Sequence, residues 1–283
     1  MSGRLYLCAT PIGNLEDITL RVLNTLRDVD LIAAEDTRHS RILLEHYEIT
    51  TPLTSYHEHN KYEKAEILVE KMQRGMQIAL ITDAGTPAIS DPGEELVRQA
   101  LQAGLPVTSL PGACACITAL TMSGLPARRF VFEAFLPAEK KERREVLERL
   151  KTECRTIVLY EAPHHLRRTL EELTEALGDR RVTICRELTK KYEEGIQTTL
   201  VGAQTLYREE EPRGEFVLVL EGRSPEELRE EAAQSYAEMT LHEHLQRYLE
   251  TGMERKEAMK QVARDRNCSR REVYQGLLQE EDG

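Results

Sequence analysis

Asp83-Ala-Gly-Thr-Pro-Ala-Ile-Ser-Asp-Pro-Gly93 is the stretch of this sequence that decides its fold. It follows a short apolar run, 78–81, and precedes an amphipathic segment, 94–103. An apolar run, a loop dense in Gly, Pro and Asp, and a helical period predict a strand, a loop and a helix. Ligands of α/β proteins bind just beyond the carboxyl ends of strands, so this loop is expected to border a ligand site.

The chemistry of this loop disfavours a phosphate ligand. Asp91 is predicted to cap the helix, with Pro92 at the first helical position and Glu94 completing a capping box. These acids occupy the place where a phosphate would bind, and no Lys or Arg lies between Arg74 and Arg98. A cationic or neutral polar ligand therefore suits the loop better. The alternative is a capped surface turn without a ligand.

Composition indicates a soluble globular protein with two ordinary domains. The chain has 283 residues, of which 40% are hydrophobic and 31% are charged. No apolar run approaches the roughly 20 residues of a membrane span, which argues against a membrane partner. The first residues enter a strand-like segment without a signal peptide, so a cytoplasmic location is expected.

The cysteines and histidines do not predict a metal site. Six cysteines are present, mostly in apolar runs, and Cys114-Ala-Cys116 is the only close pair. Its spacing differs from the usual two-residue metal knuckle, which favours buried free thiols in a reducing compartment. His57-Glu58-His59 lacks a third and fourth ligand, so we expect no metal.

The formal net charge of −11 argues against nucleic-acid binding over the whole surface. The basic residues are nevertheless clustered, and a local basic strip on an acidic protein can bind a polyanion. Solvated helix faces carry similar charge runs, so clustering alone does not decide the function. The clusters are Lys140, Lys141, Arg143 and Arg144, and the doublets Arg167-Arg168, Arg180-Arg181 and Lys190-Lys191.

Strand and helix patterns alternate in two successive series. In the first, such alternation predicts a parallel-rich sheet covered by helices, and the second series repeats the α/β pattern. In the first series we predict strands at 5–9, 31–34, 53–55, 78–81 and 107–110, and helices at 18–27 (capped by Asp17), 37–47, 62–74 and 94–103. A connecting helix at 114–123, closed by Gly124, leads to the second series. There we predict strands at 130–135, 156–160, 182–185, 196–200 and 216–220, and helices at 140–151 and after Pro163.

The remainder of the chain is predicted to be helical. Ser224 begins a linker helix, and two short helices at 257–263 and 269–278 flank a turn, the second with a Ser269–Glu272 capping box. Residues 255–271 contain seven Lys or Arg and two acids, a net charge of +5. Two basic helices across a turn resemble a helix-turn-helix. We therefore predict α/β domains at 1–113 and 114–224, and a helical tail at 225–283.

Three loops of the first series each follow the carboxyl end of a strand and are expected to converge on one cleft. Three further loops come from the second series. In their order these six loops closely resemble the tetrapyrrole-methylase superfamily of S-adenosylmethionine enzymes. The resemblance extends over essentially the whole chain, because it also includes residues 34–38, residues 55–60 and the helical tail. The loops are Thr10-Pro-Ile-Gly-Asn14, the Asp83 loop, Pro111-Gly-Ala113, Tyr160-Glu-Ala-Pro163, Arg186-Glu-Leu-Thr-Lys190 and Gly214-Glu-Phe-Val217.

The resemblance implies two α/β domains with S-adenosylmethionine in the cleft between them, and a homodimer. A sulfonium cofactor has no phosphate, which agrees with a loop that carries carboxylates and no Lys or Arg. Small residues let the backbone approach such a ligand closely. The cofactor-binding residues implied are Pro11, Asp83, Gly85, Ala88, Ile89, Ala113, Tyr160, Ala162 and Phe216.

One departure from the family pattern bears on the substrate. Members that act on porphyrin-like substrates carry Gly-x-Gly-Pro-Gly-Asp after the first strand, where this chain has Thr10-Pro-Ile-Gly-Asn14. This difference favours the branch that modifies RNA. That branch implies 2′-O-methylation of a cytidine ribose in the decoding region of small-subunit ribosomal RNA, within the assembled 30S subunit.

Two charged pairs are candidates for the chemical step. A ribose hydroxyl is a poor nucleophile and benefits from a base or from a charge that stabilises the developing alkoxide. Glu187 and Lys190 are one pair, and Asp36 and Arg38 are the other; a structural salt bridge is the alternative for both. The tail is expected to bind RNA through Arg255, Lys256, Lys260, Arg264, Arg270 and Arg271.

Two other functions remain open at this point. The first is a methyltransferase of the same fold that acts on a small tetrapyrrole or on protein. The second is a non-catalytic regulator in which the helix-turn-helix binds DNA and the α/β part senses a ligand. A carboxylate-pair hydrolase is disfavoured because no pair of acids is isolated from basic neighbours.

Overall fold

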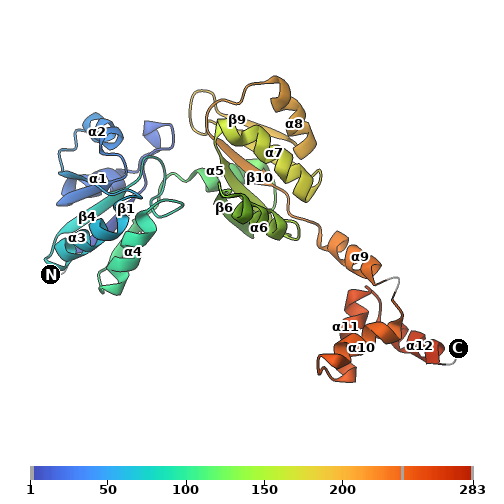
Figure 1. The fold of residues 1–283 in the computed structure, drawn as a ribbon. Helices are drawn as coiled ribbons and strands as arrows, with labels where there is room; N and C mark the ends of the chain where they lie inside the picture. The colour runs from blue at the N-terminus through green and yellow to red at the C-terminus, as the bar shows by residue number, and fades with distance from the viewer. Residues whose placement is uncertain (1–2, 237–238, 282–283) are drawn as a thin grey trace.

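A computed structural model describes residues 3–236 and 239–281 of the chain. Figure 1 shows two sheet-containing parts in succession, followed by a helical tail beyond them. Each sheet has five strands and is covered by helices. The α/β architecture predicted from the alternating patterns is therefore confirmed.

The first sheet is parallel throughout, with the strand order β3-β2-β4-β1-β5. Alternate residues of its strands face opposite sides, so α3 and α4 cover one face while α1 and α2 cover the other. The carboxyl ends of β4, β1 and β5 consequently lie side by side, which brings three of the predicted loops together. The bounds are β1 Arg4–Cys8, β2 Leu31–Ala34, β3 Leu53–Ser55, β4 Gln77–Ile81, β5 Val107–Leu110, α1 Leu20–Asp28, α2 Thr37–His46, α3 Lys61–Gln73 and α4 Gly93–Gln102.

Two predicted helix starts are wrong. Asp17 belongs to a single 3₁₀ turn, η1 (Leu15–Asp17), and α1 begins after Thr19, whose hydroxyl accepts a hydrogen bond from Val22 N–H at 3.1 Å. Helix α4 begins after Pro92 without a side-chain cap, so Glu94 forms no capping box.

The carboxylate of Asp91 does not bind the Glu94 N–H group that a capping box would require. It accepts hydrogen bonds from Gly93 N–H at 2.7 Å and from Ala88 N–H at 3.0 Å. By reaching back to Ala88 it closes the loop on itself, which a capping box could not do.

Helix α5 (Ala115–Ser123) joins the two sheet-containing parts. It ends at Gly124, whose φ of 70° lies in the left-handed region, as the sequence predicts. Its apolar residues, including Cys116, Ala119 and Leu120, cover one face of the second sheet.

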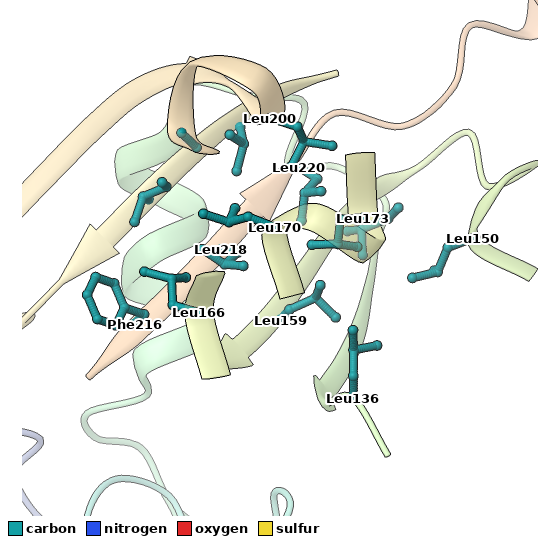
Figure 2. Close-up of a cluster of buried hydrophobic side chains, with 14 of the residues drawn as sticks. Leu136, Leu150, Leu159, Leu166, Leu170, Leu173, Leu200, Phe216, Leu218 and Leu220 are labelled. Carbon is teal, nitrogen blue, oxygen red and sulfur yellow. The ribbon is translucent and has the colours of Figure 1, made fainter. Parts of the chain in front are cut away.

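The second sheet is mixed, with the order β6-β7-β10-β8-β9. Only β6 and β7 are parallel; the other neighbouring strands are antiparallel. Figure 2 shows the core on its other face, where Leu166 and Leu170 of α7 face Leu159 and Leu218 of the sheet. The bounds are β6 Phe130–Phe135, β7 Thr156–Glu161, β8 Arg181–Arg186, β9 Glu194–Thr199, β10 Phe216–Leu220, α6 Lys140–Leu150, α7 Pro163–Leu177 and α8 Leu200–Glu209.

The tail contains one more helix than predicted. After the linker helix α9 (Pro225–Ser235), α10 (Leu241–Glu250), α11 (Arg255–Asp265) and α12 (Arg270–Glu281) pack around a small core. The Ser269–Glu272 capping box is present, with hydrogen bonds of 2.6 and 3.2 Å. Buried His244 joins α10 to α11, because its ring contacts Asp265 at 3.2 Å.

The predicted boundaries at 113/114 and 224/225 fall just before α5 and α9, and they stay a prediction. Within the residues that the structure describes, every helix is too short or too polar to cross a membrane.

Candidate active site

A cavity of ≈ 530 Å³ lies where the first sheet faces the second. Loops after β1, β2, β4 and β5 form its wall on one side. The ends of β6 and β7 and the start of β10 form the other side. The lining residues are Ile12, Glu35, Thr82, Asp83, Ala84, Gly85, Thr86, Ile89, Ser90, Asp91, Cys114, Ala115, Phe135, Tyr160, Glu161, Ala162, Pro163, Leu188, Glu215, Phe216 and Val217.

The lining is acidic and apolar. It includes five carboxylates, those of Glu35, Asp83, Asp91, Glu161 and Glu215, and no Lys, Arg or His among the described residues. Such a cavity disfavours phosphate and favours a cation that carries an apolar or aromatic body. The Asp83 loop alone already disfavoured phosphate, and the residues of the whole cavity agree with that inference.

The loops after β1 and β4 are joined through their backbones. Thr10 N–H donates to Gly85 C=O at 2.9 Å, and Gly85 N–H donates to Thr10 C=O at 3.1 Å. Gly85 has a φ of +83°, and a Cβ added there would lie 3.2 Å from Cγ2 of Ile12. A side chain at this position would therefore strain the backbone and crowd the cavity wall.

The conformation of the Asp83 loop is fixed by two carboxylates. The side chain of Asp83 accepts a hydrogen bond from Asp36 N–H at 3.2 Å, and Asp91 binds the backbone of the loop as described above. Burial raises the pKa of Asp91 against the opposing effect of its backbone hydrogen bonds. Ala88 and Ser90 adopt φ values of 66° and 63°, which non-glycine residues rarely do.

The second sheet contributes aromatic residues and a buried acid. Tyr160 makes edge-to-face contacts with Phe132 and Phe135, at centroid distances of 5.0 and 5.6 Å. The side chain of Glu161 is 4% exposed and accepts hydrogen bonds from Ala162 N–H, at 2.8 Å, and from the hydroxyl of Thr169.

Glu187 and Lys190 lie beside the cavity rather than in its wall. Lys190 Nζ is 2.9 Å from Glu187 Oε1 and 3.0 Å from Glu215 Oε2, and Glu215 does line the cavity. Burial opposes the charge of Lys190, but its hydrogen bonds to Glu187 and Glu215 outweigh this effect and raise its pKa. The hydrogen bond from Lys190 lowers the pKa of Glu187, so both groups are ionised at neutral pH.

Two glycines make room for this charged group. A Cβ at Gly13 would lie 2.4 Å from Cγ of Lys190, and one at Gly214 would lie 2.5 Å from Oε1 of Glu187. Gly13 follows β1, so the Lys190 side chain packs against the first sheet's loop while belonging to the second sheet.

Asp36 and Arg38 form a separate, more exposed pair. The Arg38 guanidinium is 3.1 Å from Asp36 Oδ2, and its side chain is 91% exposed. Hydrogen bonds from Arg38 lower the pKa of Asp36 to about 2. Neither side chain lines the cavity; Asp36 caps α2 and orients Asp83 through its backbone.

The predicted cofactor residues are brought together around the cavity. Six of them line it: Asp83, Gly85, Ile89, Tyr160, Ala162 and Phe216. The other three are adjacent in the chain to lining residues, and the carbonyl of Ala113 accepts a hydrogen bond from the Thr86 hydroxyl at 2.9 Å. Sequence reasoning missed Glu35, Glu161 and Glu215, although each is next to a residue or within a motif that it quoted.

The predicted RNA-binding residues are distant from this group. All six are exposed on α11 and α12. Figure 1 shows these helices beyond α9, at the opposite end of the molecule from the first sheet. In this arrangement the tail does not border the cavity.

Cys114 is a further lining residue with unusual chemistry. Its Sγ is 3.4 Å from Sγ of Cys116, in the first turn of α5. The hydrogen bond from Cys116, supported by backbone N–H groups and Thr86, lowers the pKa of Cys114 to about 6. Cys8, Cys116 and Cys185 are buried, as expected, but Cys154 is exposed, which corrects the prediction for that thiol.

No group of three or more His, Cys, Asp or Glu in the described part of the chain could hold a metal ion.

Comparison with known proteins identifies the class to which this fold and cavity belong. The family model of the Tetrapyrrole (Corrin/Porphyrin) Methylases matches residues 4–204, and the chain belongs to this family. Ribosomal RNA small subunit methyltransferase I of Bacillus subtilis (strain 168) is 50% identical over 272 residues, covering 96% of this chain and 93% of that protein. The protein of the same name from Synechocystis sp. is 48% identical over 283 residues, covering 99% and 100%.

Solved structures share the fold at low sequence identity. A diphthine synthase matches with a TM-score of 0.63 at 14% identity, covering 78% of this chain and 91% of that one. Uroporphyrin-III C-methyl transferase from Thermus thermophilus, complexed with S-adenyl homocysteine, matches with a TM-score of 0.56 at 19% identity, covering 77% and 97%.

Gly85→Val is expected to lower the affinity for S-adenosylmethionine more than tenfold. The added side chain would meet Ile12 and strain a backbone at φ +83°. Isothermal titration calorimetry measures the change. Gly104→Val is the matched control, because Gly104 has a φ of +70° and no atom lies within 4 Å of an added Cβ. Equal affinities of the two variants would contradict the expectation.

Cys114 is expected to react with iodoacetamide as a thiolate at mildly acidic pH. Because its pKa is lowered to about 6, the rate should reach half its maximum near that pH. Peptide mass spectrometry measures the rate across pH, with exposed Cys154 as the internal reference. A half-maximum near the free-thiol value of ~8.5 would count against the thiol pair as the cause.

Proposed function

We propose that this protein transfers the methyl group of S-adenosylmethionine to small-subunit ribosomal RNA. The observation that carries the proposal is the cavity of ≈ 530 Å³, with five carboxylates and no basic residue in its described lining. A sulfonium ion with an adenosine and an amino-acid group matches this lining, because it is cationic at sulfur and has no phosphate. The named relatives at 48–50% identity support ribosomal RNA as the substrate.

The finer specificity is part of the same proposal. The acceptor is the 2′-hydroxyl of a cytidine ribose in the decoding region, and the substrate is the assembled 30S subunit. Support comes from Thr10-Pro-Ile-Gly-Asn14, which replaces the glycine-rich loop of porphyrin-modifying members. We also propose that the protein acts as a homodimer in the cytoplasm; exposed Ile117 and Met122 on α5 offer apolar surface for the contact.

The residues of the chain serve binding and positioning in this reaction. The lining that includes Asp83, Gly85 and Phe216 holds the cofactor, which supplies an electrophilic methyl group when bound. In-line approach of the ribose oxygen to that methyl depends on placement, which accounts for much of the rate of such transfers.

Lys190 is proposed to assist the chemical step. Its ammonium contacts Glu215, a lining residue, which supports a role for its positive charge in stabilising the ribose oxygen as that oxygen becomes an alkoxide. The raised pKa of Lys190 keeps that charge in place at neutral pH, which makes lysine a poor base here and a good electrostatic stabiliser. Asp36 and Arg38 are assigned the lesser role of orienting the Asp83 loop.

The test of the proposed function uses purified 30S subunits lacking the modification and labelled S-adenosylmethionine. Label should appear in a cytidine 2′-O-methyl group of the decoding region, with undiminished transfer after chelation of divalent ions from the enzyme before assay. Label in a porphyrinogen or in ribosomal protein instead of RNA would support the same-fold alternatives.

Lys190→Ala is expected to lower kcat by about 10²–10⁴, the range typical of acid–base and charge-stabilising groups, with little change in cofactor affinity. Lys191→Ala is the control, because Lys191 is exposed and contacts only the neighbouring Tyr192 ring among the interactions described. Single-turnover kinetics and calorimetry separate the two effects. Parallel loss of thermal stability and activity would indicate a structural salt bridge.

A further inference from the structure

A second concave surface lies outside the cofactor cavity, between α6 and α7. It encloses ≈ 560 Å³, and we call it the α6–α7 groove. Its lining carries six basic and four acidic side chains, whereas the described lining of the cofactor cavity has no basic residue. The lining residues are Glu139, Lys140, Lys141, Arg143, Arg144, Leu147, Glu148, Lys151, Arg168, Glu172, Glu175 and Ala176.

Most carboxylates of the groove are already engaged. Glu139 caps α6 by accepting a hydrogen bond from Glu142 N–H at 2.8 Å. Glu148 pairs with Lys151 at 2.7 Å. Glu172 accepts from two arginines at 2.5 and 2.9 Å, which leaves Glu175 as the remaining acid of the lining.

Three basic side chains of the groove have no ion-pair partner among the described residues. Lys140, Lys141 and Arg144 are exposed and form no ion pair with any residue that the structure describes. They lie within the first turns of α6, where the helix dipole adds to their positive charge. Three accessible cations in one concave surface suit phosphate groups far better than they suit an apolar or cationic ligand.

The groove has a fixed position relative to the cofactor cavity. Strands β6 and β7 are parallel, with Phe135 opposite Tyr160, and both of these residues line the cavity. Helix α6 begins five residues after Phe135, and α7 begins at Pro163, itself a lining residue. The amino ends of the two helices therefore lie at the edge of the sheet that borders the cavity.

A buried chain of side chains links the two sites. Arg143 is 7% exposed; its Nε donates to Glu172 at 2.5 Å and its Nη2 donates to the Thr169 hydroxyl at 2.7 Å. That hydroxyl in turn donates to Glu161, in the cavity wall. Satisfied buried networks of this kind are rigid, so the groove and the cavity are held in one geometry.

We propose that the α6–α7 groove binds backbone phosphates of the RNA strand next to the ribose that enters the cofactor cavity. The inference rests on the proposed function. Carboxylates in the cavity repel phosphate, so the nucleotide that enters must be retained by phosphates bound outside it. Lys140 and Lys141, at the amino end of α6, place cations of the groove toward the strand ends that line the cavity, whereas the basic tail lies at the far end of the molecule (Figure 1).

The test is a triple substitution, Lys140→Gln, Lys141→Gln and Arg144→Gln, in the full-length enzyme. It should raise KM for 30S subunits at least tenfold and leave kcat and the calorimetric affinity for S-adenosylmethionine near those of the unaltered enzyme. The dependence of binding on salt should become shallower by ~2 in the log–log slope, at about 0.7 for each single-strand phosphate that is no longer neutralised. Exchange of lysine and arginine at the same three positions should preserve KM.

A matched triple substitution on the tail, Lys256→Gln, Arg270→Gln and Arg271→Gln, removes the same charge at a distance. The groove proposal holds if the groove substitution raises KM more than the tail substitution does. It is overturned if the groove substitution leaves KM and the salt slope unchanged. If the unaltered enzyme transfers no methyl group, the proposed function is rejected, and direct binding of the same variants to 30S subunits, measured without turnover, still tests the groove.

Discussion

The paired backbone hydrogen bonds between Thr10 and Gly85 are the constraint on which the cofactor cavity depends. They fix the loop after β1 against the loop after β4, at the one edge where adjacent parallel strands end together. Gly13, a few residues along, then provides the surface against which Lys190 of the second sheet packs. The two main-chain hydrogen bonds between the loops after β1 and β4 therefore also help to position Lys190, which comes from the second sheet-containing part.

The loops on the two sides of the cavity share a form of strain. Ala88 and Ser90 have positive φ values on one side, and Glu187 and Thr189, at 51° and 65°, have them on the other. Each such residue costs of order 1–3 kcal/mol and persists only where its surroundings impose the conformation. Here they do: Asp91 closes one loop, and the Glu187–Lys190–Glu215 ion pairs close the other.

The sequence predicted those features that depend on local pattern or on the ends of strands. The parallel first sheet, the end of α5 at Gly124 and the convergence of the Asp83 loop with the loops after β1 and β5 are of this kind, whereas the approach of Tyr160 and Phe216 was implied only by the family resemblance. The antiparallel strands of the second sheet were not predicted, although the short connection between β8 and β9, without a helix, is a signal for an antiparallel pair. Glu161 and Glu215 were missed because only tertiary packing turns one acid among 49 toward a cavity.

The two sites also resolve an electrostatic conflict. A cationic cofactor calls for carboxylates, while an RNA substrate is repelled by them, and one cavity cannot satisfy both at close range. In this fold the carboxylates line the cofactor cavity, and the exposed basic residues line the α6–α7 groove. Glu161 faces the cavity, Arg143 lies beneath the groove, and Thr169 between them accepts from one and donates to the other. In this buried network Glu172 compensates the charge of Arg143, and Thr169 satisfies one oxygen of Glu161, so the exposed cations on α6 remain available to a polyanion.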